Sequence, residues 1–477
     1  MFAEVRAASE PGAGYPVHVE KEFSKYVGCG ILGRGFLRVR CDACGEEELV
    51  AFSCHGKGFC PSCIGRRMND VSTRLVDDIL PHADYRQWVF TFPYRLRPLL
   101  AYDKKLWSKV ISIAMSKVFS WQRKQARRLG YRKSEPLGLC ASQRFGSLLQ
   151  LNPHGHSAIP DGVLAFGDGA PIWVSLSAPT QSDVESIATS IVKAVLKELA
   201  RRGESHGNDD EDSNAAYAEA ACVERIERHL GDDESPTASP SDLSAVVTTA
   251  LGRFSVHAGT TVSADDRPAL ERLIRYTLRP PLAQSRLSRT ESGKVRYRLR
   301  KPYYDGRTEV VLSPVAFLKR LAAFVPPKGQ HVIRYFGLLA PRAKHRKSIV
   351  GLGLAAKASA SGDAAAAPIG NHDCEAEKPK RSSYRKSWAA LLSRVFLHEA
   401  LKCNRCGGTR KIIAGITDRD VVGRILDHLG LPSEVPIMAR ARPPPQRRFD
   451  FEPIAEEPQW ADPSDFAFGH WDPADPA

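Results

Sequence analysis

The sequence predicts an α+β protein in which a zinc ribbon-like domain precedes a larger domain of strands and helices. Three observations lead to this prediction. Six of the eleven cysteines lie between residues 16 and 75, which is typical of a small domain folded around a metal. Strand-like and helix-like segments follow one another along residues 76–350. Residues 386–432 predict a small helical C-terminal unit around two further cysteines.

Local patterns predict the first elements of the larger domain. Residues 88–93 are aromatic and β-branched before a proline, which predicts a strand. Residues 106–128 place apolar side chains at helical spacing and end in basic residues, so they predict a helix. Residues 163–166 and 172–174 flank a Gly-Asp-Gly sequence, and this arrangement predicts a β-hairpin.

The second half of this domain begins with helical patterns over residues 180–202 and 268–279, the latter stopped by two prolines. Residues 294–300 then alternate apolar and basic side chains, and residues 308–312 return after an Asp-Gly turn. We expect a hairpin with one apolar face. Its other face carries Arg296, Arg298 and Arg300, which could contact a DNA backbone or form an ordinary solvated face.

Three segments have compositions that do not favour a packed core. Residues 203–245 are acidic and rich in Ser, Gly, Asp and Asn, which predicts a partly disordered insertion. Residues 351–385 are rich in Ala, Gly, Ser and Lys and predict a linker. Residues 433–477 form a Pro-rich tail that we expect to be extended or disordered.

The formal net charge of +14 indicates a polyanionic partner such as DNA. Acidic residues gather around 209–212 and from 452 onward, so the remaining chain is more basic than the total suggests. The alternative is a basic surface without a specific partner. The sequence contains no run of about 18 apolar residues, so it does not predict a membrane span. Residues 1–14 lack the apolar core of a signal peptide. We therefore expect a cytoplasmic, nucleoid-associated protein.

The strongest single motif is a pair of Cys-x-x-Cys sequences in the N-terminal domain. Thiolates at this spacing can complete a tetrahedral structural zinc site, whereas the alternative is a set of buried free thiols. Arg66 and Arg67 follow at once and could face phosphate. Cys29 lies nearby, and Cys54 could replace one ligand. The predicted zinc ligands are Cys41, Cys44, Cys60 and Cys63.

A further Cys-x-x-Cys sequence, Cys403 to Cys406, supplies only two ligands. His398 could be a third, and the pattern offers no fourth. The motif therefore predicts either a second zinc site or a turn that carries two thiols.

His154 and His156 are two residues apart in an extended segment, so both side chains point to one side of a strand. Two imidazoles on one face can bind a divalent metal, here Mg²⁺ or Mn²⁺. Such ions prefer oxygen donors, so we expect a third ligand. The candidates are Gln143, Gln150 and His257.

Tyr276 lies on the predicted helix 268–279 and could act as a nucleophile toward a phosphodiester. The alternative is a packing tyrosine at the edge of an apolar helix face. Arg272, Arg275 and Arg279 crowd the same helix and could hold a phosphate, which favours the functional interpretation. A Gly-rich phosphate loop is absent from the sequence, so ATP hydrolysis is not supported.

Together these motifs resemble the rolling-circle transposases of bacterial insertion sequences, the insertion-sequence-ninety-one family and its common-region relatives. Those proteins are HUH nucleases, named for a His-hydrophobic-His motif. The resemblance follows the family order along nearly the whole chain. The matching stretches are residues 40–67, 86–95, 143–146, 152–163, 257–259, 275–284, 334–341, 403–408 and 425–432.

The resemblance implies an N-terminal zinc-binding, DNA-binding domain over residues 1–75. A nuclease domain of antiparallel sheet flanked by helices would follow over residues 76–350, with strand 88–92 beside the strand that carries the histidines. It also implies cleavage and joining of single-stranded DNA at element ends through a 5′-phosphotyrosine, in a rolling-circle-like mechanism. The metal-binding roles fall on His154 and His156, and the nucleophile role falls on Tyr276.

Two residues depart from the family pattern. Gly155 stands between the histidines, where a hydrophobic residue is usual, and glycine loosens a strand. Arg272 occupies the position of the partner tyrosine in two-tyrosine members, so the chain resembles the one-tyrosine branch. Two rival functions stay open. One is a replication initiator or relaxase with the same chemistry, and the other is a non-enzymatic zinc-ribbon DNA-binding protein or a decayed transposase.

Overall fold

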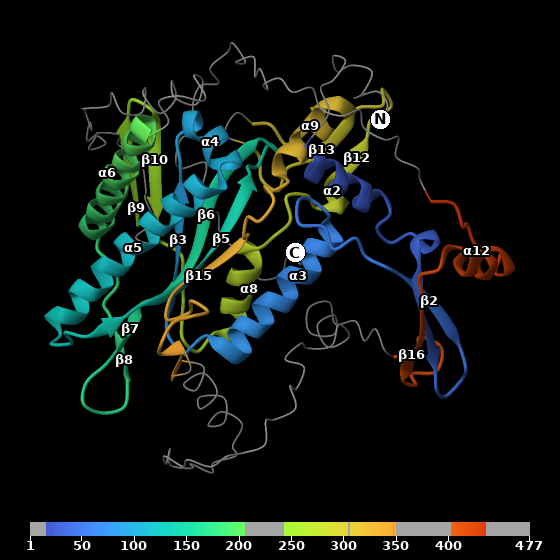
Figure 1. Ribbon diagram of the computed structural model, residues 1–477, viewed down its shortest axis with the longest axis horizontal. Helices are drawn as coiled ribbons and strands as arrows, with labels where there is room; N and C mark the ends of the chain where they lie inside the picture. Colours follow the sequence, from blue (N-terminus) through green and yellow to red (C-terminus); the bar gives the residue numbers. More distant parts are fainter. Residues whose placement is uncertain (1–15, 206–242, 304–305, 347, 350–401, 436–477) are drawn as a thin grey trace.

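The computed structural model describes residues 16–205, 243–303, 306–346, 348–349 and 402–435. Its centre is a seven-stranded antiparallel sheet with strand order β15-β5-β6-β3-β10-β9, and β11 also pairs with β3 (Figure 1). The strands are β3 (Tyr85–Thr91), β5 (Leu137–Phe145), β6 (Leu151–Pro160), β9 (Ser244–Thr249), β10 (Gly252–His257), β11 (Thr261–Val262) and β15 (Ile333–Gly337).

One face of the sheet packs against two long helices, α5 (Lys104–Arg128) and α6 (Gln181–Ser205). Asp103 caps α5 because its carboxylate accepts hydrogen bonds from the backbone N–H groups of Lys105 and Leu106. The sheet contributes Trp88 and other alternate residues of its central strands to this core. Side-chain alternation therefore leaves the intervening residues, the two histidines of β6 among them, on the opposite face.

The opposite face is covered by α8 (Arg267–Thr277), which also packs against α3 (Pro61–Arg74). The helix α8 begins at Asp266, whose side chain accepts from the N–H of Ala269. A buried hydrogen bond of 2.8 Å from Thr73 to Glu271 joins the two helices. Because α3 continues into the π-helical turn η2 (Leu75–Ile79), the predicted domain boundary near residue 75 falls inside one continuous helical segment.

Two smaller sheets and several short helices surround this centre. One sheet contains β4 (Ser134–Glu135), β7 (Gly162–Ala165) and β8 (Ile172–Ser175), and the other contains β12 (Leu287–Arg289), β13 (Val295–Arg298) and β14 (Glu309–Leu312). The remaining helices are α2 (Val17–Val27), α4 (Arg97–Tyr102), α9 (Pro314–Phe324), η1 (Leu32–Arg34), η3 (Tyr94–Leu96) and η4 (Gln284–Arg286).

The C-terminal unit is not a separate helical unit, which corrects the sequence prediction. Its strand β16 (Arg410–Ile416) pairs with β1 (Phe36–Cys41), which pairs in turn with β2 (Glu47–Ala51). Its helix α12 (Arg419–His428) lies beside this sheet in Figure 1, where colours from opposite ends of the chain meet. The pairing of β16 with β1 joins residues far apart in sequence, and local sequence patterns do not predict such a contact.

Most predicted elements are confirmed. They include the strand at 88–93, the helices at 106–128, 180–202 and 268–279, and both hairpins. The linker 351–385, His398 and nearly all of the acidic insertion and the tail lie outside the described residues. Within the described part of the chain, no helix has both the length and the apolar character needed to cross a membrane.

Candidate active site

His154 and His156 lie on the α8-facing side of β6, as predicted from their spacing. Both are buried, with 7% and 2% of their surface exposed, and their ring centroids are 4.8 Å apart. The strand expected beside them is β3, where Val89 lies opposite His156. The two imidazoles therefore form one compact pair in the centre of the sheet.

Hydrogen bonds orient both rings. The Nδ1–H of His154 donates to the carbonyl of Asn152 at 2.7 Å, which leaves Nε2 with its lone pair for a metal. The amide of Gln87 contacts Nδ1 of His156 at 3.1 Å. The atom placed against Nδ1 is the amide nitrogen of Gln87; a 180° turn of the amide puts Oε1 there instead, so that Nδ1–H donates and Nε2 of His156 keeps its lone pair. Each ring can thus present Nε2 as a ligand.

Both imidazoles are held neutral. Burial lowers the pKa of His154 to about 4, an effect opposed by the Asn152 hydrogen bond and reinforced by the guanidinium groups of Arg279 and Arg97. Burial also lowers the pKa of His156 well below its ordinary value, and His154 adds to this shift. A neutral imidazole is the form that binds a metal, so the pair suits this role at neutral pH.

Gln143 is a candidate third ligand on a strand that pairs directly with β6. It lies on β5 directly opposite His154, and only 2% of its surface is exposed. Its amide NH₂ donates to the carbonyls of Tyr276 at 3.1 Å and Thr277 at 3.0 Å. Both amide hydrogens are used, so the orientation of the amide is fixed. Its Oε1 is buried, and no hydrogen-bond partner for it exists among the described residues.

The other two candidates lie at the β5–β6 turn and across β3 from the pair, and the second of them, His257, is near enough to His156 to lower its pKa. Gln150 lies where the β5–β6 hairpin turns, with its amide against Gly146. His257 is on β10, opposite Val89 of β3, so it is separated from His156 by one intervening strand. An amide oxygen is a ligand that Mg²⁺ and Mn²⁺ accept, and an unsatisfied buried oxygen is costly. Gln143 and Gln150 share this property, and the position of Gln143 opposite His154 with its hydrogen bonds to the end of α8 favours Gln143.

Tyr276 reaches the histidine pair from α8. Its ring centroid is 5.7 Å from that of His156, with the two rings nearly perpendicular. The guanidinium of Arg279 lies 4.5 Å from the Tyr276 ring centroid and 5.7 Å from that of Phe145. Tyr276 is only partly buried. A tyrosine, two imidazoles and a guanidinium therefore meet in one place.

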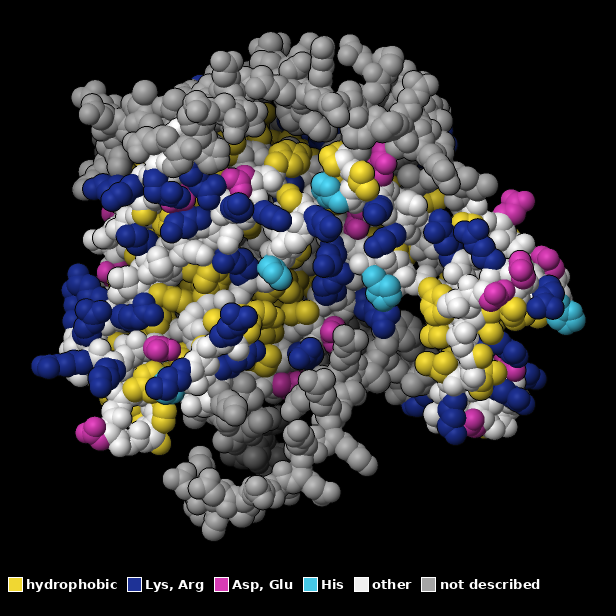
Figure 2. Space-filling model, viewed as in Figure 1, with side chains coloured by type: hydrophobic (Ala, Val, Ile, Leu, Met, Phe, Trp, Pro, Cys, Tyr) yellow, Lys and Arg dark blue, Asp and Glu magenta, His cyan; other side chains and the backbone are white. Residues whose placement is uncertain are grey.

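The remaining arginines of the sequence prediction differ in their surroundings. Arg272 lies 3.8 Å from Asp266, and Arg275 is partly exposed on the same helix. Arg296 lies 3.3 Å from Glu309, which offsets its charge. On this hairpin Arg298 and Arg300 are exposed, and so is Arg66 of α3. Figure 2 shows Lys and Arg side chains spread over the described part of the visible face, among apolar and uncharged side chains, and such a distribution can attract a polyanion.

Sequence reasoning missed two arginines. Arg97, at the start of α4, is close enough to His154 to lower the pKa of that imidazole. Arg144 is 6% exposed, and its guanidinium donates to the carbonyls of Ala101 and Ala323. Burial lowers the pKa of Arg144 to about 10. Arg144 therefore holds the backbone beside Gln143, whereas Arg97 adds positive charge at the histidine pair.

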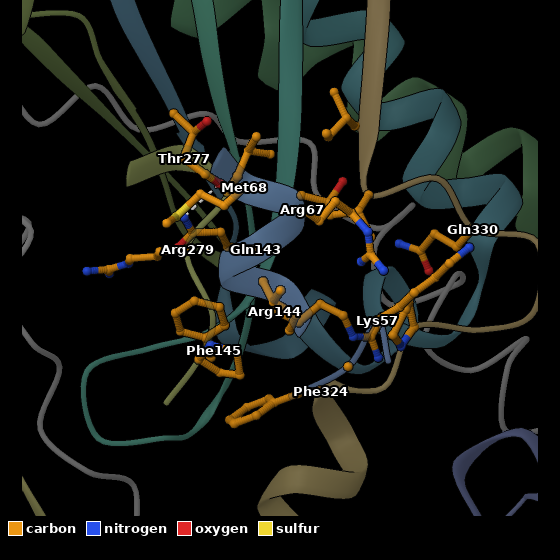
Figure 3. A pocket seen from close by; sticks show the side chains of 18 residues that line it. Lys57, Arg67, Met68, Gln143, Arg144, Phe145, Thr277, Arg279, Phe324 and Gln330 are labelled. Carbon is orange, nitrogen blue, oxygen red and sulfur yellow. Dashed lines mark hydrogen bonds between the residues drawn. The ribbon is translucent and has the colours of Figure 1, made fainter. Parts of the chain in front are cut away.

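A recess opens beside these residues, and the close view in Figure 3 shows its lining. Gln143, Phe145 and Arg279 line it on the side of the histidine pair, whereas Lys57 and Arg67 come from the N-terminal region. Arg67 is anchored there, because its guanidinium donates to the carbonyl of Gly56 at 3.2 Å. The recess thus connects the cysteine-rich region with the tyrosine helix through cationic and aromatic side chains.

Gly155 faces the core with α5, on the side of β6 opposite the histidines. A Cβ at this position would lie 2.9 Å from Cδ1 of Ile111 and 3.1 Å from Sγ of Cys140. Ile111 is fully buried, so its side chain fills the space that a larger residue would use. The neighbouring side chains thus leave no room for a side chain at position 155.

We therefore expect Gly155→Val to destabilise the fold by about 1–3 kcal/mol, because the added methyl groups overpack a filled core. Chemical denaturation measures this loss. The same substitution in an Ile111→Val background should cost less, because that change removes the atom in closest contact. A gain in stability from Gly155→Val alone would instead mean that the glycine loosens the strand.

The cysteines form two groups, which corrects the predicted single site. Cys60 and Cys63 group with Cys29 and Cys54, and in each group all four Sγ atoms lie within 4.8 Å of one another. Within this first group the Sγ–Sγ distances include 3.7 Å for Cys29–Cys60 and 3.3 Å for Cys54–Cys63. Cys60 precedes the first turn of α3, and its thiol lowers the pKa of Cys63 to about 4. Four such thiols fit a structural zinc ion.

The second group contains Cys41 and Cys44 together with Cys403 and Cys406. The two N-terminal Cys-x-x-Cys pairs therefore do not share an ion. The β-sheet explains why: β1 ends at Cys41 beside β16 and the turn before β2 carries Cys44, while Cys60 and Cys63 lie at the start of the separate helix α3. The spacing of cysteines does not report which pairs meet in space.

Comparison with known proteins adds independent evidence. Residues 2–92 match a family model described as "Transposase zinc-binding domain", and residues 138–347 match one described as "Putative transposase". The chain is 25% identical over 340 residues to "Transposase for insertion sequence element IS801" of Pseudomonas savastanoi pv. phaseolicola, covering 70% of this chain and 73% of that protein.

A second relative is "Putative transposase y4qJ" of Sinorhizobium fredii (strain NBRC 101917 / NGR234). The identity is 24% over 309 residues, which covers 64% of this chain and 71% of the relative. No solved structure matches the chain. The matched regions include the first cysteine group, the histidine pair and Tyr276.

Proposed function

The chain belongs to the IS91 family of transposases, and on that premise we propose that it nicks and rejoins single-stranded DNA through a 5′-phosphotyrosine on Tyr276. One observation carries the proposal. The Tyr276 ring lies 5.7 Å from the ring of His156, although β6 and α8 are separated in sequence by the acidic insertion. Such a meeting of nucleophile and metal-type ligands suits phosphoryl transfer.

In this proposal Tyr276 is the attacking group. Its phenol loses its proton, and Oη forms a bond to phosphorus as the bond to the 3′ oxygen breaks in line. The products are a 5′-phosphotyrosine and a DNA 3′ hydroxyl, which takes up a proton. The energy of the phosphodiester is conserved, so a 3′ hydroxyl can reverse the step and join a new strand. Arg279 and Arg97 balance the charge of the phosphate.

The residues that would hold the catalytic Mg²⁺ or Mn²⁺ are His154, His156 and Gln143. They fit such an ion because both imidazoles are neutral and Gln143 offers a buried oxygen without a partner among the described residues. When bound, the ion polarises the scissile phosphate and stabilises charge on the leaving oxygen. Gln143 also holds the carbonyl end of α8, so it positions the tyrosine.

The recess beside Gln143 is the proposed path of the DNA strand. Lys57, Arg67 and Arg279 line it and can face its phosphates. Zinc at the first cysteine group would hold the segment that contributes Lys57 and Arg67.

The decisive test is formation of the covalent adduct. Purified protein is incubated with Mn²⁺ and single-stranded oligonucleotides from the DNA that flanks its own gene. A denaturing gel then detects protein linked to DNA, and mass spectrometry locates the nucleotide. We expect the adduct on the peptide that contains Tyr276, and little or none with the same sequence as duplex.

The rivals give different results in this test. A replication initiator or relaxase would cut an origin-like sequence in preference to the element ends. A binding protein or decayed transposase would bind DNA tightly and form no adduct with any oligonucleotide. An adduct on a residue other than Tyr276 would contradict the proposed nucleophile.

We expect Gln143→Ala to lower Mn²⁺ affinity and the rate of adduct formation by about 10–100-fold each. The change removes an oxygen ligand and both hydrogen bonds that hold the end of α8. Isothermal titration calorimetry measures the affinity, and thermal unfolding reports the stability lost with these bonds.

Gln150→Ala is the matched control, because this second glutamine also has a buried Oε1 without a partner among the described residues. It should leave Mn²⁺ affinity unchanged. The opposite pattern, in which only Gln150→Ala weakens Mn²⁺ binding, would assign the third ligand to Gln150.

A further inference from the structure

We propose that Cys41, Cys44, Cys403 and Cys406 bind a second zinc ion, which fastens the C-terminal unit to the N-terminal hairpin. This site is distinct from the first cysteine group and from the proposed nuclease site. The zinc-binding family model covers Cys41 and Cys44 but ends at residue 92, and the other model ends at residue 347, so neither reaches Cys403 and Cys406.

The positions of the four sulfur atoms fit one tetrahedral ion. All four Sγ atoms lie within 4.8 Å of one another, with 3.5 Å between Cys41 and Cys406 and 3.6 Å between Cys44 and Cys403. A tetrahedral zinc ion with Zn–S bonds of about 2.3 Å separates its ligands by about 3.8 Å. A disulfide would need about 2.05 Å. The spacing therefore indicates a shared ion.

The two Cys-x-x-Cys turns have matching backbones. In each, a glycine follows the second cysteine with a positive φ, 75° at Gly45 and 72° at Gly407. The N–H of Gly45 donates to the carbonyl of Cys41 at 3.0 Å, and the N–H of Gly407 donates to the carbonyl of Cys403 at 2.9 Å. A glycine tolerates this conformation without strain. Each turn thus brings both of its thiols to one side.

The next residues repeat the match. The N–H of Cys41 donates to the carbonyl of Glu46, and that of Cys403 donates to the carbonyl of Gly408, both at 2.8 Å. The N–H of Gly408 also donates to Sγ of Cys406 at 3.4 Å. Hydrogen bonds of this kind stabilise a thiolate. The two Cys-x-x-Cys turns therefore have equivalent geometry and face each other, which suits coordination of one ion by four thiolates.

The rest of this module has little else to hold it together. Among the described residues its buried apolar cluster is Phe36, Val422 and Leu426, with four partly buried side chains packed against it: Leu32, Leu49, Ile416 and Ile425. The ion pairs Arg410–Glu48 and Lys411–Asp42 have exposed partners, and such pairs contribute little. A core of this size does not stabilise a fold alone, whereas a bound zinc ion can supply the missing free energy.

Zinc is the ion that fits best. Thiolates arranged in a tetrahedron select zinc or iron, and an iron–sulfur cluster would spread its cysteines around several atoms. Sγ atoms within 4.8 Å of one another fit a single ion instead. Single iron ions and zinc ions differ in element analysis and colour, so the experiment separates them.

The test uses the full chain and counts metal by elemental analysis. We expect about two zinc ions per chain. Cys403→Ser with Cys406→Ser should leave about one, and so should Cys41→Ser with Cys44→Ser. The combined quadruple variant should still keep about one, because both pairs belong to the same ion. Cys140→Ala, which changes a buried cysteine outside both groups, should keep both ions.

A second readout guards against variants that merely fold poorly. In the Cys41→Ser, Cys44→Ser variant, Cys403 and Cys406 should become reactive toward a thiol-alkylating reagent, while Cys60 and Cys63 stay protected. Three results would overturn the proposal: full zinc content in the Cys403→Ser, Cys406→Ser variant, loss of both ions from the quadruple variant, or iron in place of zinc. None depends on nuclease activity.

Discussion

Replacing Tyr276 with phenylalanine is expected to abolish the covalent protein–DNA adduct while DNA binding persists. The substitution removes only Oη, so the ring keeps its contacts with His156 and Arg279. Arg272 occupies the position one helical turn earlier, so that position offers no second tyrosine. We expect adduct formation to fall by at least about a thousand-fold, as for other removed nucleophiles.

Denaturing gels measure the adduct, and a mobility-shift assay measures binding of the same single-stranded oligonucleotide. Tyr131→Phe is the control, because Tyr131 packs on a separate small apolar cluster. It should leave both measurements unchanged. An adduct that persists in Tyr276→Phe would rule out this tyrosine as the nucleophile. Loss of binding and adduct together would indicate a structural role for the hydroxyl.

Replacing His154 and His156 together with alanine is expected to eliminate both Mn²⁺ binding at the active site and adduct formation. Two of the three proposed ligands disappear, and one amide oxygen does not hold such an ion alone. Calorimetric titration with Mn²⁺ measures the first effect, and the adduct gel measures the second. We expect a loss of at least about a hundred-fold in adduct formation.

Because both rings are buried, the double variant also leaves a cavity and should unfold at a lower temperature. His257→Ala is therefore a useful comparison, since this histidine lies one strand away from the pair. It should retain Mn²⁺ binding. Zinc content should stay unchanged in the double variant, which separates loss of the catalytic ion from general unfolding. If the double variant still forms the adduct, His154 and His156 are not required for catalysis and the proposed metal site is wrong.

Local features of the site were predictable from the sequence. The spacing of His154 and His156 fixes both on one side of a strand, and proline after the tyrosine helix fixes where that helix ends. The family resemblance correctly placed strand β3 beside the histidines. Each of these inferences depends on neighbouring residues, where backbone geometry restricts the outcome.

Features that depend on distant contacts were not predictable. The partners of each cysteine pair follow from β1 meeting β16 and from α3 starting beside Cys29. Gln143 was one of three candidates, and only its register with His154 and its bonds to α8 single it out. Arg97 precedes a proline in a short helix and carries no local signal of its position near His154.

The pairing of β1 with β16 has a consequence for synthesis of the chain. Cys41 and Cys406 are 365 residues apart, so β1 leaves the ribosome long before its partner strand exists. At about 5–20 residues per second, the wait is about 20–70 s. During that time the nascent hairpin carries an open strand edge and two uncovered thiols, which expose it to mispairing and oxidation. A prematurely terminated polypeptide would keep this exposed edge permanently.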